Sequence, residues 1–390
     1  MVWTVYIPRF ANGALAVFAV VTLLSCASDD GSLTGLAERG DLARIRSLLD
    51  KGADINAKDD DGRTALMIAS RKGDIEIVKL LLDRGATVNE KSAFDNTALI
   101  WASWADRLEA LKLLLDKEAE VNAKNDKGDT ALTWASFDGD LEVVKLLLEK
   151  GSDVNARNDS GETPLIISSR IGNREVVRLL LQKGADVNAR NNRGDTALTW
   201  ASLEGHTGVA KFLLDTGADV NARNNFGDTV LMWPLWRGDF DVVRLLVNNG
   251  ADVNAKNNFG DTAIVWASLK GSLQLAKLLL DKGADVNARN HKGDTPLIWA
   301  CLEDRPVMAK LLLENGADIN AKNNLGDTAL MAASSKGHLE VVRLLLAEGA
   351  DTEVQNSKGD TAFILASRKG FSQIVELLKT HPKKSNTRYR

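Results

Sequence analysis

The chain has 390 residues, of which 44% are hydrophobic and 26% are charged, with 49 Lys and Arg against 53 Asp and Glu. This composition is typical of a folded soluble protein and excludes a chain that is disordered throughout. The formal net charge of -4 supplies no general field that would attract nucleic acid, so we expect no nucleic-acid partner. Two cysteines, Cys26 and Cys301, are too few for a disulfide framework or a multi-cysteine zinc site, and the four histidines form no cluster. We therefore expect neither a metal nor a cofactor.

The N-terminal segment has the features of an export signal. Residues 10–24 carry no charge, follow Arg9 and give way at once to a polar segment. They fall short of the ~20 apolar residues that a helix needs to cross a bilayer, so we interpret residues 1–25 as a signal peptide. Residues 23–26, with the sequence LLSC, resemble the lipobox of bacterial lipoproteins. The resemblance implies cleavage just before Cys26, lipidation of the Cys26 thiol, and a short tether over residues 26–31.

Two other outcomes at this end of the chain stay open. The signal could be cut after Ala27, which follows small residues, or it could remain as an uncleaved anchor. All three outcomes export the protein. Ala27 rather than Asp follows the cysteine, which for such lipoproteins implies the outer membrane, facing the periplasm, rather than the inner membrane.

A threonine recurs every 33 residues along most of the chain. The series is Thr64, Thr97, Thr130, Thr163, Thr196, Thr229, Thr262, Thr295, Thr328 and Thr361. Such a fixed period indicates a repeat architecture. The surrounding motif resembles the ankyrin repeat: a Thr-Pro-Leu opening stands at residues 163–165 and 295–297, most other copies read Thr-Ala-Leu, and a Gly-Ala-Asp-Val-Asn-Ala ending recurs. The resemblance covers residues 31–380 and implies an all-α solenoid of stacked helix-turn-helix repeats with β-hairpin loops.

The residues of one repeat lead to the same architecture. In residues 64–96, small and apolar residues share one face of a short first helix, while Ile75, Val78, Leu81 and Leu82 form the apolar stripe of a second helix. Gly85 stands just past that helix, where a left-handed residue is needed. Neither helix is long enough to be stable alone, so each repeat must bury its apolar face on the next one.

Departures from the repeat at the two ends set the domain boundaries. Residues 32–58 keep the second helix and the ending but lack the opening threonine, so we interpret them as an N-terminal capping repeat. Residues 59–380 contain ten ankyrin repeats. Residues 381–390 form a basic tail, which we expect to be solvated.

Two rows of charge follow the same period. Lys124 and Asp129, for example, flank one hairpin turn, and most other repeats have the same pair of charges at these positions. Opposite charges at this spacing are placed across a hairpin, so we expect each pair to neutralise itself rather than bind phosphate or nucleic acid. Asparagines such as Asn191 and Asn224 are expected to form the turns.

Six of the nine tryptophans stand in one register of the first helix. They are Trp101, Trp134, Trp200, Trp233, Trp266 and Trp299. Ankyrin proteins usually have an aliphatic residue here, so these rings are interpreted chiefly as larger core residues. The register three residues further on is apolar in the middle of the chain and polar at both ends. It reads Arg71, Trp104, Phe137, Arg170, Leu203, Trp236, Leu269, Leu302, Ser335 and Arg368. A core requirement would not fade toward the ends, so this second register indicates an interaction surface.

The hairpin tips narrow the position of that surface. The residue before the turn glycine is Phe226 and Phe259 in two adjacent repeats and is mostly polar elsewhere. Ankyrin proteins commonly bind partners on the concave side, which the tips and the inner helices form. We therefore predict a partner-binding patch that consists of Phe226, Trp233, Trp236, Phe259, Trp266 and Leu269, because aromatic residues bury large areas at low entropic cost. A second, weaker cluster comprises Phe94, Trp101 and Trp104.

Several residues depart from the repeat. Pro234 replaces an alanine inside a first helix, where it is expected to remove a backbone donor and kink the helix. The repeat that holds Thr97 has acidic residues where other copies have glycine, so its turns are expected to be strained or displaced. Cys301 takes the place of a small buried residue and is not interpreted as a nucleophile.

No nucleotide-binding glycine loop and no plausible catalytic triad occur, so we do not expect an enzyme. The sequence favours a monomeric, membrane-tethered scaffold that binds a protein partner in the cell envelope. Two alternatives from other classes are a structural spacer, whose aromatic columns only stiffen the stack, and an effector delivered into a host cell. The identity of the partner is not encoded in the repeat.

Overall fold

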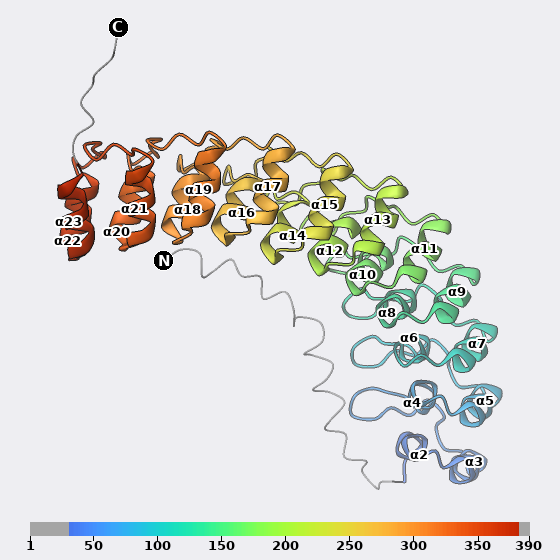
Figure 1. The fold of residues 1–390 in the computed structure, drawn as a ribbon. Helices are drawn as coiled ribbons and strands as arrows, with labels where there is room; N and C mark the ends of the chain where they lie inside the picture. Colours follow the sequence, from blue (N-terminus) through green and yellow to red (C-terminus); the bar gives the residue numbers. More distant parts are fainter. Residues whose placement is uncertain (1–30, 382–390) are drawn as a thin grey trace. The chain divides into compact units, whose positions relative to one another are not determined.

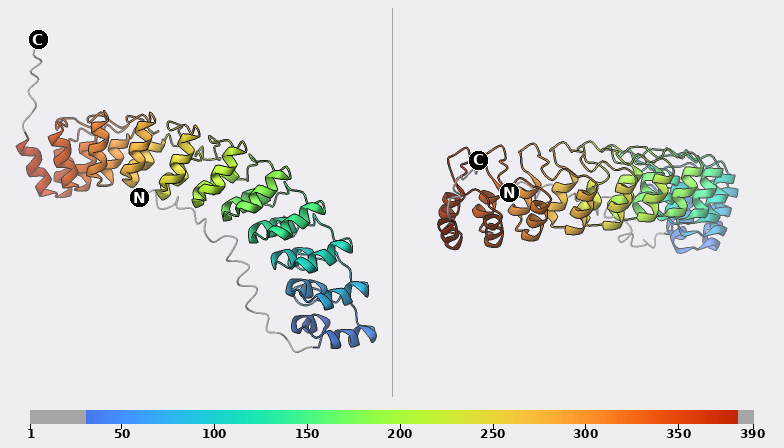
Figure 2. Two further views of the ribbon diagram at one scale, coloured as in Figure 1. Left: turned by 45° about the vertical axis from the view of Figure 1, so that its right-hand side comes forward. Right: turned by 45° about the horizontal axis from the view of Figure 1, so that its top comes forward.

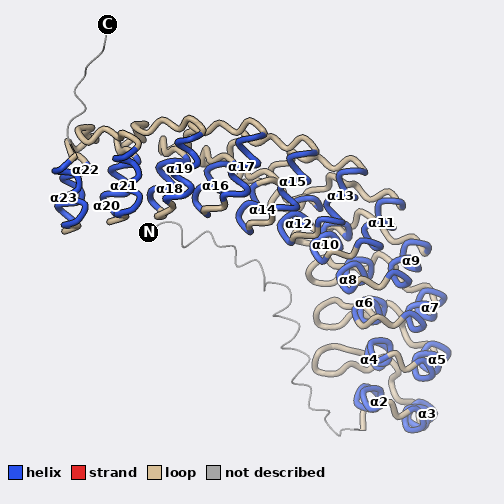
Figure 3. The backbone as a smooth tube through the Cα atoms, viewed as in Figure 1, coloured by secondary structure: helices blue, strands red, loops and turns tan. Residues whose placement is uncertain are grey.

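The computed structural model describes residues 31–381, which form eleven pairs of short helices connected by loops. Helices alternate with loops throughout, and residues 31–381 contain no regular strand (Figure 3). None of the helices within this range is both long and apolar enough to span a membrane. The expected signal peptide, the lipidation site at Cys26, most of the tether and the basic tail from residue 382 lie outside the described residues. Within the described residues, 31–159 and 160–381 form two compact units.

The first unit contains four helix pairs (Figure 1). Its helices are α2 (Leu33–Arg39), α3 (Leu42–Asp50), α4 (Ala65–Lys72), α5 (Ile75–Asp83), α6 (Ala98–Trp104), α7 (Leu108–Asp116), α8 (Ala131–Asp138) and α9 (Leu141–Glu149). Even numbers mark the first helix of each pair and odd numbers the second. The segment without the opening threonine therefore has both helices of a repeat.

The second unit contains seven pairs. Its helices are α10 (Pro164–Ile171), α11 (Arg174–Gln182), α12 (Ala197–Glu204), α13 (Thr207–Asp215), α14 (Met232–Arg237), α15 (Phe240–Asn248), α16 (Ala263–Lys270), α17 (Leu273–Asp281), α18 (Pro296–Leu302), α19 (Pro306–Glu314), α20 (Ala329–Lys336), α21 (Leu339–Ala347), α22 (Ala362–Lys369) and α23 (Ser372–Thr380). The expectation of an all-α repeat fold is confirmed.

Within each unit the first helices pack on the first helices of the neighbouring pairs, and the second helices pack on second helices (Figure 2). In the pair α4 and α5, Leu66, Val78 and Leu81 are almost completely buried, as expected. Ile75 is only half-buried, and Ile77 takes a buried position instead. Every pair thus buries its apolar face on its neighbours. A pair of helices of nine residues or fewer that stood alone would leave this apolar face in water.

In most repeats the periodic threonine immediately precedes the first helix and caps it. Thr196 precedes α12, and its hydroxyl accepts a hydrogen bond from the backbone N–H of Thr199 at 3.2 Å. The hydroxyl of Thr199 accepts in return from the N–H of Thr196, which makes a reciprocal cap of the kind that satisfies two otherwise unpaired donors. Capping therefore explains why a threonine is found at this position in repeat after repeat.

Most loops between pairs are hairpins that are closed by an asparagine side chain, and Asp59 and Ser92 take that position in the first two. In the hairpin at Asn191, its Oδ1 accepts from the N–H of Arg193 and of Asp195, and the N–H of Asn191 donates to the carbonyl of Asp195 at 3.0 Å. Gly194 occupies the turn with φ 82°, a conformation that favours glycine. β-pairing within residues 31–381 consists of two isolated bridges, Lys58 with Thr64 and Arg223 with Thr229.

Each repeat is also hydrogen-bonded to the next one through the asparagine of the Gly-Ala-Asp-Val-Asn-Ala ending. Asn221 illustrates the arrangement: its Oδ1 accepts from the N–H of Asp252 at 2.8 Å and its Nδ2 donates to the carbonyl of Gly250 at 3.2 Å. Asn188, Asn254 and Asn287 make the same two bonds to the repeats that follow them. These asparagines, which are distinct from the turn formers identified from sequence, thus join neighbouring repeats.

The two rows of charge bond to the next repeat, which the pairing across each hairpin that we expected does not include. The Nζ of Lys124 donates to the backbone carbonyl of Arg157, one repeat further on, at 2.8 Å. The Oδ1 of Asp129 accepts from the Nδ2 of Asn158 at 2.9 Å. The equivalent cations Arg223 and Arg289 also donate to carbonyls of the next repeat. Both rows therefore connect repeats, because a periodic side chain lies as close to its neighbour in the stack as to its own turn.

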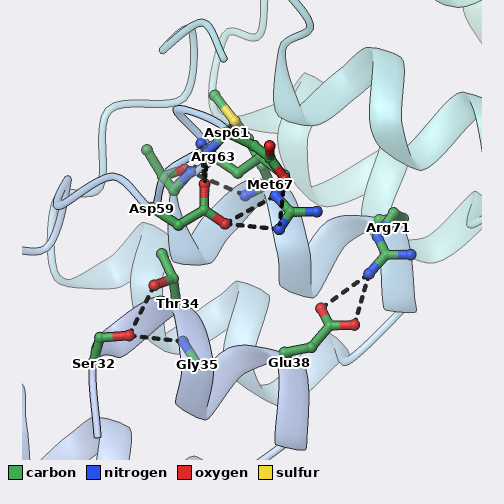
Figure 4. Close-up of polar contacts among 10 residues, drawn as sticks. Ser32, Thr34, Gly35, Glu38, Asp59, Asp61, Arg63, Met67 and Arg71 are labelled. Atoms are coloured by element: carbon green, nitrogen blue, oxygen red, sulfur yellow. Dashed lines mark hydrogen bonds and ion pairs between the residues drawn. The ribbon is translucent and has the colours of Figure 1, made fainter. Parts of the chain in front are cut away.

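At the N-terminal end of the first unit, polar side chains form several hydrogen bonds and ion pairs (Figure 4). Ser32 precedes α2, and its hydroxyl accepts from the N–H of Gly35 at 3.0 Å. Glu38 and Arg71, which occupy one register in adjacent repeats, form a two-pronged ion pair with N–O distances of 2.8 and 2.9 Å. The polar end of the register identified from sequence is thus occupied by an ion pair between repeats.

Four acidic residues adopt the left-handed backbone that glycine provides elsewhere. Asp95, Asp106 and Glu118 have φ values of 56°, 58° and 65°, and Asp304 has 53°. The turns of these repeats are therefore kept in place rather than displaced. Each of the four residues lowers the free energy of unfolding by roughly 1 kcal/mol or more relative to glycine, because its Cβ atom approaches the following carbonyl. The expected strain is confirmed.

We predict that Asn221→Ala destabilises the chain by about 1–2 kcal/mol, because it removes two hydrogen bonds between repeats at a solvent-exposed position. Urea unfolding followed by circular dichroism measures the change. Asn248→Ala, an exposed asparagine at the end of α15, is the matched control and should leave the midpoint unchanged. Equal midpoints for the two variants would contradict a stabilising role of this row of asparagines.

Candidate functional site

The predicted patch lies in the second unit, where α14 differs from the other first helices. α14 starts at Met232 and has six residues, whereas α12 and α16 have eight. Pro234 has no N–H to donate to residue 230, so the helix begins late and the proline falls in its first turn, where no donor is needed. The expected kink at Pro234 is therefore wrong, and the helix is shortened at its N-terminus instead.

Trp236 near the end of α14 and Trp266 in α16 are in contact. Their ring centroids lie 5.6 Å apart with an interplanar angle of 79°, which is the favourable edge-to-face arrangement. The Nζ of Lys270, one turn after Trp266, lies 3.2 Å from the centroid of the Trp236 ring. Partial burial, followed by the nearby charge of Arg305, lowers the pKa of Lys270 below its usual range. A cation and two rings thus form one packed unit on two adjacent first helices.

Phe226 and Phe259 stand on two adjacent hairpins. Their side chains are 39% and 45% exposed, which places them among the most exposed large apolar residues of the described chain. The carbonyl of Phe226 accepts a hydrogen bond at 3.0 Å from the N–H of Asn258, the residue just before Phe259, so the two tips are fixed next to each other. Trp233 and Leu269 are half-buried on α14 and α16.

The structure therefore brings part of the predicted patch together. Trp236 and Trp266 touch, and Phe226 and Phe259 lie on hydrogen-bonded hairpins. The tryptophan register itself serves mainly the core: Trp101, Trp200 and Trp299 are buried, and Trp134, Trp233 and Trp266 are half-buried. The interpretation of this column as larger core residues agrees with its burial.

The second predicted cluster lies in the first unit. Phe94 is 44% exposed at a hairpin tip. Trp101 is buried and meets Trp104 edge to face, with centroids 5.7 Å apart. This cluster has one exposed aromatic residue where the patch in the second unit has two.

Sequence reasoning missed two residues near the patch. Leu325 is 65% exposed and occupies the same tip position as Phe226 and Phe259, two repeats after Phe259. The register of the tips was a sufficient signal to find it. Lys270 was also missed, because its contact with the ring of Trp236 depends on the path of two helices rather than on a pattern within either.

A row of carboxylates lies beneath the tips. In successive repeats Asp195, Asp228 and Asp261 each accept a hydrogen bond through Oδ1 from the asparagine of the next hairpin, at 3.2, 2.9 and 2.9 Å. Burial raises the pKa of all three above the usual range, and the hydrogen bonds only partly oppose it. The pKa of Asp228 is raised further by the charges of Asp195 and Asp261. These carboxylates repel one another along the stack.

A separate acidic pair occurs in the first unit. A hydrogen bond with Asp140, together with burial, raises the pKa of Asp106 to about 6. Asp140 also accepts from the N–H groups of Glu142 and Val143 at the start of α9. We assign this pair to local structure, since residues 31–381 contain no group of three or more His, Cys, Asp or Glu that could hold a metal ion.

Cys301 is completely buried in α18, and burial raises the pKa of its thiol far above the usual range. A thiol held in its protonated form is a poor nucleophile. Its interpretation as a small buried residue is confirmed.

Sequence models of known families match most of the chain. A model described as ankyrin repeats (3 copies) matches residues 33–125, 120–191, 185–257 and 249–323, and a second, described as ankyrin repeats (many copies), matches residues 312–366. A search of curated proteins finds no match.

The carboxylate row predicts an unusual dependence of stability on pH. A raised pKa means that the folded state binds protons more readily than the unfolded state, so stability rises as the pH falls from neutral toward the ordinary value of 3.8. We predict that Asp228→Asn, which can keep the bond from Asn257, raises the thermal midpoint at pH 7. The difference should shrink as the pH falls toward 3.8, because the native aspartate then becomes protonated too. A variant less stable than the native chain at pH 7 would contradict this account.

Proposed function

Since the chain belongs to the ankyrin-repeat family, whose repeats generally mediate interactions between proteins, we propose that it is a non-enzymatic scaffold that binds a protein partner through the hairpin tips and first helices of its second unit. The observation that carries the proposal is the pair of exposed rings at Phe226 and Phe259, which lie on hairpins fixed to each other by a backbone hydrogen bond. Exposed aromatic side chains on a rigid support are typical of interface hot spots.

Physical chemistry favours these residues as anchors. A phenylalanine side chain loses little rotamer freedom on binding, and complete burial of one contributes about 1.5–3 kcal/mol. The hairpins that carry Phe226 and Phe259 are closed by the side chains of Asn224 and Asn257, so little backbone ordering remains to be done when a partner binds. The packed unit of Trp236, Trp266 and Lys270 lies on first helices of the same two repeats and extends the proposed surface.

The spacer alternative explains the tryptophan column better than it explains the tips. Trp101, Trp200 and Trp299 are buried between neighbouring helices, where larger rings stiffen the stack. Phe226 and Phe259 are much less buried, since they are 39% and 45% exposed. A spacer gains nothing from apolar rings in water, whereas a binding surface does.

We further propose that the scaffold is tethered to a membrane of the cell envelope through a lipid on Cys26. The support comes from the sequence: an uncharged segment precedes residues 23–26, which read LLSC and resemble a lipobox. Two acyl chains on one residue suffice for stable anchoring. Only residues 27–31 separate Cys26 from the N-terminal capping repeat, which begins at residue 32, so the tether would hold this repeat close to the bilayer. Ala27 after the cysteine favours the outer membrane, facing the periplasm.

We predict that Phe226→Ser combined with Phe259→Ser leaves the fold intact, because both side chains are exposed, but abolishes capture of a specific partner by crosslinking in the native cell. Val307→Ser is the matched control: Val307 is 61% exposed on a second helix, away from the hairpins. Circular dichroism checks folding. If the double variant captures the same proteins as the control, the surface is not used and the spacer alternative is favoured.

The tether has its own test. Cys26→Ser should shift the protein from the membrane fraction to the soluble fraction, and mass spectrometry of the native protein should detect a lipid on its first residue, Cys26. Ala27→Ser is the control and should stay with the membrane. An unlipidated chain that begins at Ser28, or a chain found outside the cell, would contradict the lipid tether.

A further inference from the structure

The last helix pair of the second unit, α22 and α23, has an outer face that no other repeat covers. The two helices lie at the C-terminal end of that unit (Figure 1). Residues 382–390 do not continue the repeat, because Pro382 stands where the recurring ending has its glycine and two lysines follow in place of Ala-Asp. These residues therefore supply no further helix pair that would stack on α22 and α23.

This face exposes apolar side chains. Phe363 is 36% exposed, whereas Leu330, in the same register of the preceding repeat, is 1% exposed. Val375 is half-buried, and its counterpart Val342 is completely buried. Within residues 31–381, by contrast, no large apolar side chain of the N-terminal capping repeat is exposed. A terminal repeat ordinarily presents a polar outer face to water, so the apolar residues at this end indicate a further contact.

The last repeat and the tail also have a charge opposite to that of the whole chain. Residues 362–390 contain seven Lys and Arg and one acidic residue, Glu376, while the corresponding residues 329–357 of the preceding repeat contain two basic and four acidic residues. Lys379 contributes to the change, because it stands where every other repeat has leucine or valine. In a chain of net charge -4, this end is thus a local region of positive charge.

Ion pairs do not take up this positive charge. The side chains of Lys369 and Lys379 are exposed and form no ion pair within residues 31–381. Glu376 lies one turn before Lys379 in α23 without pairing with it. Arg368 is engaged, since it forms an ion pair with the buried carboxylate of Asp360. The tail, residues 382–390, adds four basic residues and no acidic one.

The apolar and basic residues belong to one face. Val375 and Lys379 are four residues apart, so they lie on the same side of α23. Phe363 is on α22, which packs on α23 and ends with Lys369 in its last turn. We call the surface that consists of Phe363, Lys369, Val375 and Lys379 the end face.

We propose that the end face and the basic tail together dock onto an anionic lipid surface. Apolar side chains enter the boundary between headgroups and acyl chains, while Lys and Arg interact with the phosphate groups of anionic lipids. Clusters of about four to eight Lys and Arg next to an apolar segment are typical of such contacts. This contact is separate from the hairpin tips that bind a protein partner and from a lipid on Cys26.

Charge argues against two other occupants of the end face. A second copy that docked end to end would place the lysines of both copies against each other. The tail carries the same sign of charge as the face that it would have to cover. An acidic protein would need a shape complementary to its target, whereas a fluid leaflet binds the four basic residues of the tail without any fixed arrangement.

Co-sedimentation with lipid vesicles tests the proposal. The chain from residue 26 onward, produced without the signal peptide and therefore unlipidated, keeps every helix pair and is the form to use. We expect it to bind vesicles of equal parts phosphatidylglycerol and phosphatidylcholine about tenfold or more tightly than vesicles of phosphatidylcholine alone. Lys369→Glu combined with Lys379→Glu should weaken binding about tenfold or more, since each basic residue near an anionic leaflet strengthens binding about fivefold.

Two further variants make the result specific. Lys211→Glu combined with Lys277→Glu changes the net charge equally at exposed positions on α13 and α17, and should bind like the native chain. Lys383→Glu combined with Lys384→Glu changes only the tail, leaves the last repeat as it is, and should also weaken binding. Circular dichroism checks the fold of each variant.

The remaining outcomes overturn the proposal. An equal loss of binding in the variant at residues 211 and 277 would show a response to net charge alone. Equal binding to both kinds of vesicle, or to neither, would exclude an anionic lipid surface. A dimer in sedimentation velocity that Phe363→Ser dissociates would assign the end face to a second copy. None of these results bears on the hairpin tips or on Cys26, because the assay contains neither a partner protein nor a lipidated chain.

Discussion

Hydrogen bonds and apolar contacts between neighbouring repeats are the interactions on which the rest of the structure depends. No helix of the described chain exceeds nine residues, a length at which an isolated helix is not stable in water. Each pair therefore relies on the next one, through packing of first helix on first helix and through side chains such as Asn221 that bond to the following backbone. Stability in such a chain is close to a sum of terms between nearest neighbours.

This dependence divides the residues of a repeat into two sets. Thr196, Asn191 and Asp195 are occupied by capping, by closing a hairpin or by joining it to its neighbour, so their identity is fixed by the stack. The tip position is under weaker demands, because its backbone makes the hydrogen bonds between hairpins whichever side chain it carries. Phe226 and Lys292 can therefore stand in equivalent positions without disturbing the fold. Variation at these positions is what a recognition surface requires.

Much of the fold follows from the sequence because a period of 33 residues repeats one local solution many times. The helices, the left-handed turns and the burial of Cys301 were all predictable in this way. Predictions were wrong where one repeat departs from the others or where partners lie in different repeats. Pro234 shortens α14 instead of kinking it, because the start of a helix can move to place a proline in its first turn. Lys124 and Asp129 bond to the next repeat, which no pattern within one hairpin reveals.

The candidate site was predictable in its position but less so in its details. The register of the tips identified Phe226 and Phe259, and their exposed fractions of 39% and 45% confirm that both face solvent. The contact of Lys270 with Trp236 could not be predicted from the sequence, because the two residues lie on helices of different repeats. The structure also separates the tryptophans that serve the core from the rings that face water, a distinction that composition alone does not make.

Position-specific photo-crosslinking in the native cell tests the central claim most directly. A benzoylphenylalanine placed in turn at residues 226, 259, 244 and 277 compares two hairpin tips with two exposed positions on the second helices α15 and α17. The account predicts a discrete crosslinked protein from positions 226 and 259 and none from 244 and 277. Crosslinks from the second helices alone, or from none of the four positions, would contradict it.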